Sequence, residues 1–186
     1  MLLKGQYPHS YIWFRIILKE LDMKYLDLPV IGKVSRISLG CDHYGETIDE
    51  AIAIKQLDMY LERGGNLLDT ARVYGQKIDE GPSTSELLLG KYLKTIDRGK
   101  VIIATKGGHP HIGHMDSPRL DRTSLTNDIT ASIEQLGTPP DIFFLHRDWR
   151  DIPAGELIEI LNTFIEKGYT RSIGASNWSV ERIKGK

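Results

Sequence analysis

Residues 101–108 read VIIATKGG, an apolar run that ends in a lysine and two glycines. Apolar side chains occupy both alternating positions of this run, so a strand formed by it would be buried on both faces. The segment DIFFLH, at residues 141–146, has the same character and ends in a histidine. Strands buried on both faces are typical of parallel sheets. These two segments therefore predict neighbouring, buried, parallel strands.

The rest of the chain alternates strand-like and helix-like segments around these two runs. Further strands are predicted over residues 34–40, 66–70 and 169–177, and helices over 47–65, 85–96, 124–137 and 153–168. The strands begin about 33 residues apart, a spacing typical of β-α units with right-handed crossovers. For the first helix, Thr47 with Glu50 predicts a capping box, and Gly64-Gly65 predicts its end.

Two architectures have this alternation: an open doubly wound sheet and a (β/α)8 barrel. The turn SLGCDHYGE (38–46) lacks the G-x-G-x-x-G spacing, which disfavours a dinucleotide-binding doubly wound sheet. A complete barrel needs eight units, typically about 250 residues. About five are present, and the chain stops as a sixth begins. We therefore expect an α/β fold, a partial (β/α)8 TIM barrel with strands six to eight missing.

The composition is that of a soluble globular protein. The chain has 186 residues, 40% hydrophobic and 26% charged, with a formal net charge of -1. No basic excess indicates a nucleic-acid partner. The single cysteine, Cys41, excludes an internal disulfide framework and a multi-cysteine zinc site, and it fits a reducing, cytoplasmic environment.

The most apolar N-terminal stretch is YIWFRIIL, residues 11–18, which Arg15 interrupts. It is shorter than the roughly 18–20 apolar residues of a membrane span. Its spacing predicts a short amphipathic helix in an N-terminal extension, residues 1–23, ahead of a barrel portion at 24–186. Two interpretations of this extension remain open. It is either a segment that packs on the domain, or the result of a start placed too early in a chain that would begin at Met23. Docking on a membrane surface is a lesser alternative.

Polar side chains end successive predicted strands. The second strand ends at Asp69, with Tyr74 on the loop behind it, the third at Lys106 and the fourth at His146. Because the carboxyl ends of barrel strands converge on one face, we expect these four side chains to meet. Each has an ordinary structural explanation alone, but burying several titratable groups together is costly unless they pair or act in chemistry.

The chemistry of these groups suits a carbonyl substrate. A neighbouring ammonium stabilises a phenolate, so it makes a tyrosine a stronger acid, and a carboxylate keeps the lysine charged. Such a tyrosine can protonate a carbonyl oxygen while an imidazole donates a hydrogen bond to the same oxygen. No nucleophile with its own base is evident. Reduction by a hydride-carrying cofactor is the reaction that this set predicts.

The chain resembles the aldo-keto reductases over about residues 24–186. The matching runs are KVSRISLG, GGNLLDTARVYG, SELLLGKYLK, VIIATKGG, FFLHRD and RSIGASNW. The resemblance implies a barrel that binds NADPH or NADH and reduces a small aldehyde or ketone, including sugar-like compounds. It also implies a catalytic set of Asp69, Tyr74, Lys106 and His146, and cofactor binding by Ser176, Asn177 and Asp69, the Ser-Asn pair holding the nicotinamide carboxamide.

Some features depart from the family pattern. The chain ends before the region that binds the cofactor's phosphates, so we expect it to be weakly active or inactive alone, with self-association through exposed barrel edges. Gly40-Cys41-Asp42 replaces a frequent Gly-Thr, which puts a cofactor contact there in doubt. The loop GGHPHIGHMD (107–116) has three histidines, but without fixed geometry they favour a substrate-side loop over a metal site.

Two other functions remain as alternatives. One is a lyase in which Lys106 forms a Schiff base. The other is a non-catalytic, nucleotide-sensing or interaction module, or a decayed reading frame.

Overall fold

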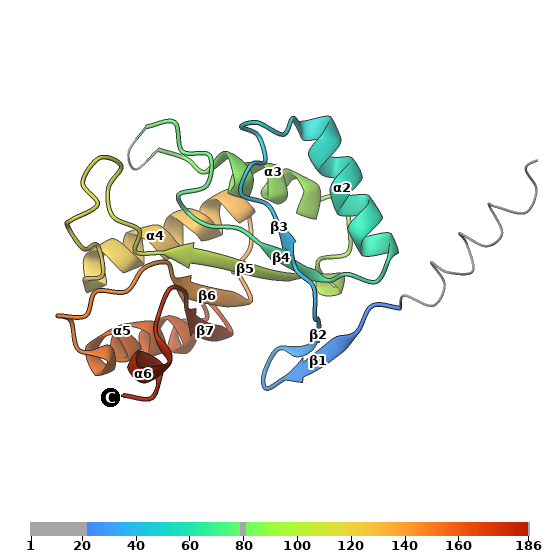
Figure 1. Cartoon of the computed structure of the whole chain (residues 1–186). Coiled ribbons are helices and arrows are strands. Elements are labelled where there is room, and N and C mark those ends of the chain that lie inside the picture. The colour runs from blue at the N-terminus through green and yellow to red at the C-terminus, as the bar shows by residue number, and fades with distance from the viewer. Residues whose placement is uncertain (1–21, 79–80, 186) are drawn as a thin grey trace, which may run out of the picture.

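The computed structural model describes residues 22–78 and 81–185 (Figure 1). The helix expected at residues 11–18, and with it most of the extension 1–23, lies outside the described residues. The described chain opens with a two-stranded antiparallel hairpin, β1 (Tyr25–Leu28) and β2 (Gly32–Ser35). A five-stranded parallel sheet in the order β3-β4-β5-β6-β7 follows.

The parallel strands are short and follow one another in chain order. Their bounds are β3 (Leu39–Gly40), β4 (Leu67–Asp69), β5 (Ile102–Gly107), β6 (Ile142–Leu145) and β7 (Ser172–Ala175). A doubly wound sheet reverses its strand order at a switch point, and this sheet does not. The consecutive order is that of a barrel wall, as the sequence predicts.

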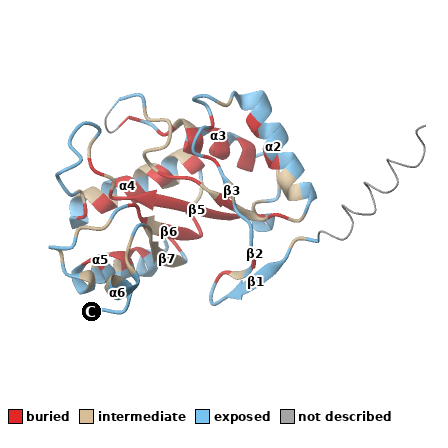
Figure 2. Ribbon diagram, viewed as in Figure 1, coloured by how far each residue is buried: buried red, intermediate tan, exposed pale blue. Residues whose placement is uncertain are grey.

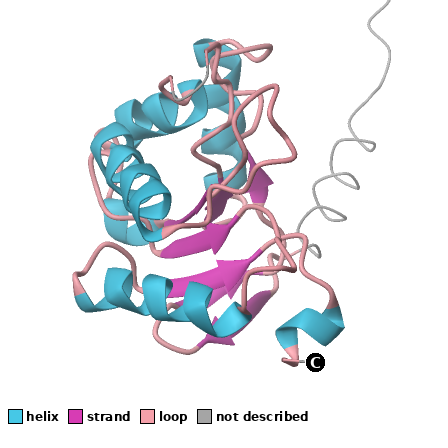
Figure 3. Cartoon of the chain, turned by 90° about the vertical axis from the view of Figure 1, so that its left-hand side faces the viewer, coloured by secondary structure: helices cyan, strands magenta, loops and turns pink. Residues whose placement is uncertain are grey.

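The helices that connect the strands are α2 (Glu50–Glu62), α3 (Thr84–Leu93), α4 (Arg122–Leu136) and α5 (Ala154–Glu166), with a short α6 (Val180–Ile183) after β7. Figure 3 shows the longer helices along one side of the sheet, with the short helix next to the C-terminus apart from them. The capping box predicted at Thr47 is wrong: α2 begins after Asp49, whose carboxylate accepts the Ile52 N–H at 2.9 Å. Asp49, two residues further along the chain than Thr47, is therefore the N-cap residue of α2.

The single strand predicted over residues 34–40 is also wrong. Its first residues belong to β2, and β3 begins only at Leu39. The Arg36 N–H donates to the Lys24 carbonyl at 2.8 Å, which extends the hairpin, while the Asn66 side chain accepts the Ser35 N–H at 2.8 Å. Residues 36–38 are therefore an exposed connection between β2 of the hairpin and β3, the first strand of the parallel sheet.

The central strands of the sheet are buried on both faces, most completely β5, where all six residues are buried (Figure 2), whereas the edge strand β7 is only partly buried. Ile103 packs outward with residues of α2 and α3, whereas Ile102 and Ala104 pack on the inner face. There they meet Ile31 and Val34 of the hairpin. The hairpin thus covers part of the inner face, which explains why β5 begins with apolar residues on both of its faces. In the described residues, no helix is long and apolar enough to cross a membrane.

Candidate functional site

Lys106 is the centre of the polar cluster at the carboxyl ends of the strands. Its ammonium Nζ donates to Asp69 Oδ2 at 2.8 Å, to the Thr70 carbonyl at 2.8 Å and to the Tyr74 hydroxyl at 3.1 Å. Lys106 is buried, and three acceptors satisfy all three of its N–H donors. A buried ammonium is stable only when it is paired in this way. The expected meeting of Asp69, Tyr74 and Lys106 is therefore present.

The strand register brings these groups together. Asp69 of β4 is paired with Ala104 of β5, and Lys106 lies two residues further along β5, on the same face. Two residues after Lys106, Gly108 ends the strand in a left-handed turn, with φ +74°. Side chains separated by 37 positions are thus neighbours because parallel strands end at one edge.

A tight turn holds Tyr74. The Tyr74 carbonyl accepts the Ser83 hydroxyl at 2.7 Å, and its N–H donates to the Ala71 carbonyl at 3.1 Å. The next residue, Gly75, has φ +68°, and a Cβ there would meet Thr84 Oγ1 at 1.9 Å. Only glycine fits both the backbone conformation and the space. The loop therefore fixes where the phenol lies rather than leaving it mobile on the surface.

His146 completes the four predicted residues. Its ring meets the Tyr74 ring edge to face, with 5.7 Å between centroids and 83° between planes. Burial lowers the pKa of His146 to about 3, and the neighbouring His109, Lys106 and Arg147 act in the same direction. At neutral pH the imidazole is therefore uncharged.

Ser176 and Asn177 lie after β7, at the same edge of the sheet. The Ser176 N–H donates to the Leu145 carbonyl at 2.9 Å, and Asn177 Nδ2 donates to the His146 carbonyl at 2.8 Å and to Ser176 Oγ at 3.2 Å. Asn177 has a left-handed backbone, with φ 64°. Asparagine adopts this conformation more readily than most residues. The pair is thus tied directly to the His146 loop.

The sequence did not reveal the part that His109 plays in the cluster. Its ring lies edge to face with that of His146, with centroids 4.9 Å apart, and its Nε2 is 3.4 Å from Nη2 of Arg147. The available signal was the position of His109 directly after Lys106-Gly-Gly. His111 and His114 do not join it in a metal site: within residues 22–78 and 81–185, no group of three metal-ligating side chains is present.

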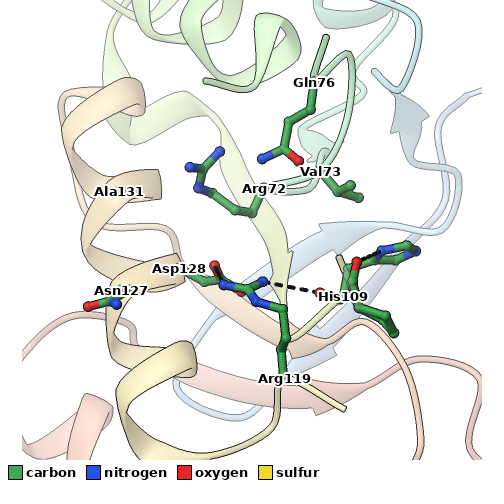
Figure 4. A pocket seen from close by; sticks show the side chains of 9 residues that line it. Arg72, Val73, Gln76, His109, Arg119, Asn127, Asp128 and Ala131 are labelled. Atoms are coloured by element: carbon green, nitrogen blue, oxygen red, sulfur yellow. Dashed lines mark hydrogen bonds and ion pairs between the residues drawn. The ribbon is translucent and has the colours of Figure 1, made fainter. Parts of the chain in front are cut away.

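A polar pocket of about 210 Å³ lies beside the cluster (Figure 4). The loops after β4 and β5 and the middle of α4 form its walls. Its lining residues are Arg72, Val73, Gln76, His109, Pro110, Arg119, Asn127, Asp128 and Ala131. None of the four predicted catalytic residues lines it. His109 alone belongs to both, bordering the pocket and contacting His146.

Buried charges form the floor of this pocket. Arg119 pairs with Asp128 through Nη2 and Oδ1 at 3.1 Å, and Arg119 Nη1 donates to the His109 carbonyl at 3.1 Å (Figure 4). Asp128 Oδ2 also accepts the Gly108 N–H at 2.7 Å. Charge-assisted bonds of this kind are strong and directional. They fasten the start of the 107–121 loop to α4.

Consecutive parallel strands with polar side chains gathered at their carboxyl edge define the class of the protein as a β/α-barrel fold. The aldo/keto reductase family model matches residues 36–185, and the chain belongs to this family.

Individual relatives agree with this assignment. The chain is 32% identical to versiconal hemiacetal acetate reductase of Aspergillus parasiticus, over 87% of this chain and 54% of that protein. It is 30% identical to aldo-keto reductase YhdN of Bacillus subtilis (strain 168), over 87% and 49%.

A solved structure, aldo-keto reductase AKR11C1 from Bacillus halodurans in its holo form, superposes with a TM-score of 0.72 at 30% identity. The match covers 87% of this chain and 53% of that one. The expected partial TIM barrel is thereby confirmed. The chain spans about half the length of the curated relatives it matches.

Proposed function

We propose that this chain carries the chemical centre of an NAD(P)H-dependent reductase that converts an aldehyde or ketone to an alcohol, with Tyr74 as the general acid. The observation that carries the proposal is the 3.1 Å contact between the Lys106 ammonium and the Tyr74 hydroxyl, with Asp69 on the same ammonium. Positive charge beside a phenol stabilises the phenolate that forms when the proton leaves.

The residues after β7 fit the carboxamide of a nicotinamide. A carboxamide needs one acceptor for its NH2 group and one donor for its carbonyl. Both hydrogens of the Asn177 amide are engaged within the chain, so its oxygen is the atom available to accept. The Ser176 hydroxyl accepts one of those hydrogens and retains its own to donate. The bound cofactor would supply the hydride that adds to the substrate's carbonyl carbon.

This chain's own residues would polarise the carbonyl and deliver the proton. As the carbon gains hydride, the electron pair of the C=O bond moves onto oxygen. The Tyr74 O–H bond breaks and its proton bonds to that oxygen, which leaves a phenolate next to Lys106. Asp69, 2.8 Å from Nζ, balances the lysine charge and fixes its direction. The proton lost from Tyr74 is then replaced from solvent.

His146 would donate a second hydrogen bond to the carbonyl oxygen. Its Nδ1 atom is buried and has no hydrogen-bond partner in the part of the chain that the structure describes. A buried N–H without an acceptor is rarer and more costly than an unused acceptor, so the hydrogen belongs on Nε2. A neutral Nε2–H imidazole is a donor without adding charge beside Lys106.

The geometry disfavours a Schiff-base lyase. An amine must lose its proton to attack a carbonyl, and Lys106 donates all three hydrogens to acceptors that include a carboxylate. A non-catalytic nucleotide-sensing module stays as the second candidate, because the family relationship alone does not require turnover.

The test measures NADPH binding by nicotinamide fluorescence and NADPH-dependent reduction of a panel of aldehydes, for the wild-type chain and for Tyr74→Phe. We expect slow turnover by the wild type, about 10²–10⁴-fold less by the variant, and equal NADPH affinity. Tyr25→Phe is the control, since the Tyr25 hydroxyl, in the hairpin, donates to the carbonyl of Gly64 after α2 and takes no part in the cluster. Equal turnover by Tyr74→Phe would refute the acid assignment. NADPH binding with no reduction of any aldehyde would favour the sensing module.

A further inference from the structure

The loop after β5 is built to bring one particular ring against His146. Gly107 and Gly108 let the backbone pass through a crowded place: a Cβ on Gly107 would lie 2.6 Å from Cζ of Phe143 and 2.9 Å from Cβ of Asp128. Asp128 and Arg119 then hold the Gly108 N–H and the His109 carbonyl. The next side chain along, His109, is therefore placed by packing and by charged hydrogen bonds.

The contacts of the His109 ring define its protonation state. Nδ1 lies 2.8 Å from the Pro110 carbonyl, which can only accept, so Nδ1 carries the hydrogen. Nε2 lies 3.4 Å from Nη2 of Arg147, which can only donate, so Nε2 presents its lone pair. The ring is thus a neutral Nδ1–H imidazole. A second proton would point at the Arg147 guanidinium, and burial together with Arg147 and Arg119 lowers the pKa of His109 accordingly.

We infer that His109 is a positioning residue for the reduction proposed above: clamped between the Pro110 carbonyl and Arg147, it holds the His146 ring in its plane and shields it from water. The inference rests on the proposed function, because it concerns the imidazole that donates to the carbonyl. His146 then has two ring neighbours, Tyr74 at 5.7 Å and His109 at 4.9 Å.

His109 lies between the candidate catalytic cluster and the neighbouring pocket. His109 contacts His146 on one side and borders the polar pocket of Figure 4 on the other. Arg147, which follows His146 in the chain, is exposed at the rim. The groups that face the His146 ring are the phenol of Tyr74, the ammonium of Lys106, the ring of His109 and the guanidinium of Arg147. Two of these are cations, so a proton added to either His109 or His146 would bring a third positive charge into the same place.

A packing role alone makes different predictions from a clamp. For packing, any flat ring of similar size would do, and the tautomer of His109 would be irrelevant. For a clamp, the Nδ1–H tautomer is required, and loss of the ring admits water to His146, whose pKa then rises toward its ordinary value. Spectra of the chain show the tautomers and the shielding of His146 without any turnover, and the turnover of His109→Phe, which keeps a ring and loses the Arg147 contact, separates the clamp from packing alone.

The experiment records long-range ¹H–¹⁵N spectra of the 186-residue chain, with its six histidines assigned by single replacements. We expect His109 as the Nδ1–H tautomer and His146 as the Nε2–H tautomer at neutral pH. In His109→Ala the pKa of His146 should rise by at least about one unit, and in His109→Phe it should stay low. His114→Ala, an exposed histidine of the same loop, is the matched control and should leave it unchanged.

The wild-type tautomers do not depend on any variant folding. An Nε2–H tautomer for His109, or an unchanged pKa of His146 in a folded His109→Ala chain, would overturn the inference. Since no substrate is involved, the outcome is separate from the test of function: expected spectra from a chain that reduces nothing would refute the reductase and leave the clamp geometry standing. Where turnover is measurable, His109→Phe should lower kcat about 10-fold and leave the KM for NADPH unchanged, because it removes the Arg147 bond but not the ring.

Discussion

The Lys106 ammonium lies 3.1 Å from the Tyr74 hydroxyl, although Lys106 belongs to β5 and Tyr74 to the loop after β4. The contact depends on the register of β4 and β5, which places Lys106, and on the turn at Gly75, which places Tyr74. The same ammonium lies 4.7 Å from the centroid of the Tyr74 ring. Charge therefore acts on both the hydroxyl and the π-face of this tyrosine.

Replacing the lysine should remove most of the proposed chemistry. Lys106→Met keeps the length of the side chain and loses the charge that stabilises the phenolate, so aldehyde reduction should fall by about 10²-fold or more. Lys91→Met is the control, because Lys91 forms an exposed pair with Glu50 on the helices. A folded Lys106→Met chain that reduces aldehydes at the wild-type rate would contradict the proposed role of Lys106.

Acid should destabilise the fold through His146. Its pKa is about 3 in the folded chain and near 6.5 when unfolded, so the unfolded state binds the extra proton between these values. This contribution to stability is fully present above pH 6.5 and declines as the pH falls, by about 2 kcal/mol between pH 7 and pH 5. In urea unfolding at both pH values, the wild type should therefore lose about 2 kcal/mol relative to His146→Gln, since every other titrating group is common to the two chains. An equal decline in the two chains would show that His146 is not protected from protonation.

Glu86 should act in the opposite direction. It is fully buried on α3, its Oε1 accepts the Thr105 hydroxyl at 2.6 Å, and burial raises its pKa to about 7. The folded state therefore holds a proton that the unfolded state loses above its ordinary value of 4.5. The contribution of Glu86 to stability should fall by about 2 kcal/mol from pH 5 to pH 8, so the wild type should lose about 2 kcal/mol relative to Glu86→Gln over that range. The same free-energy difference between variant and wild type at both pH values would count against a buried, protonated Glu86.

The turn after Tyr74 should tolerate no side chain. Gly75→Ala combines a positive φ with a contact of 1.9 Å to Thr84 Oγ1, and it should destabilise the chain by about 2–4 kcal/mol. Gly113→Ala is the matched control: φ is +87° but nothing lies within 4 Å, so only the backbone cost of about 1–2 kcal/mol remains. Denaturant unfolding measures both, and equal losses would mean that the loop yields to the added methyl group.

Sequence reasoning predicted the barrel wall well because its signals are local. The strand VIIATK is apolar at both alternating positions, and the glycine predicted to end α4, Gly137, is the left-handed C-cap. The hairpin of β1 and β2 was not predicted, because Tyr25, Leu26 and Leu28 are exposed and show no alternation of burial. The break between β2 and β3 depends on the distant Asn66, which accepts the Ser35 N–H and which no local pattern reveals.

Part of the candidate site could likewise be predicted from the sequence, and part of it could not. Asp69, Lys106 and His146 could be predicted to meet because parallel strands end at one edge. The third acceptor of Lys106, the Thr70 carbonyl, is a backbone group with no sequence signature. The contact of His109 with His146 depends on how Asp128 and Arg119 of a later segment hold the loop. Only tertiary structure determines that.

The central claim is that Lys106 and Tyr74 act as one unit, and a double-mutant cycle on aldehyde reduction tests it most directly. The rates of the wild type, Lys106→Met, Tyr74→Phe and the double variant are measured at one pH with saturating NADPH. If the lysine acts through the phenol, the double variant should be no slower than Tyr74→Phe alone, within about threefold. If the two single losses multiply in the double variant, the residues act independently and the account is wrong.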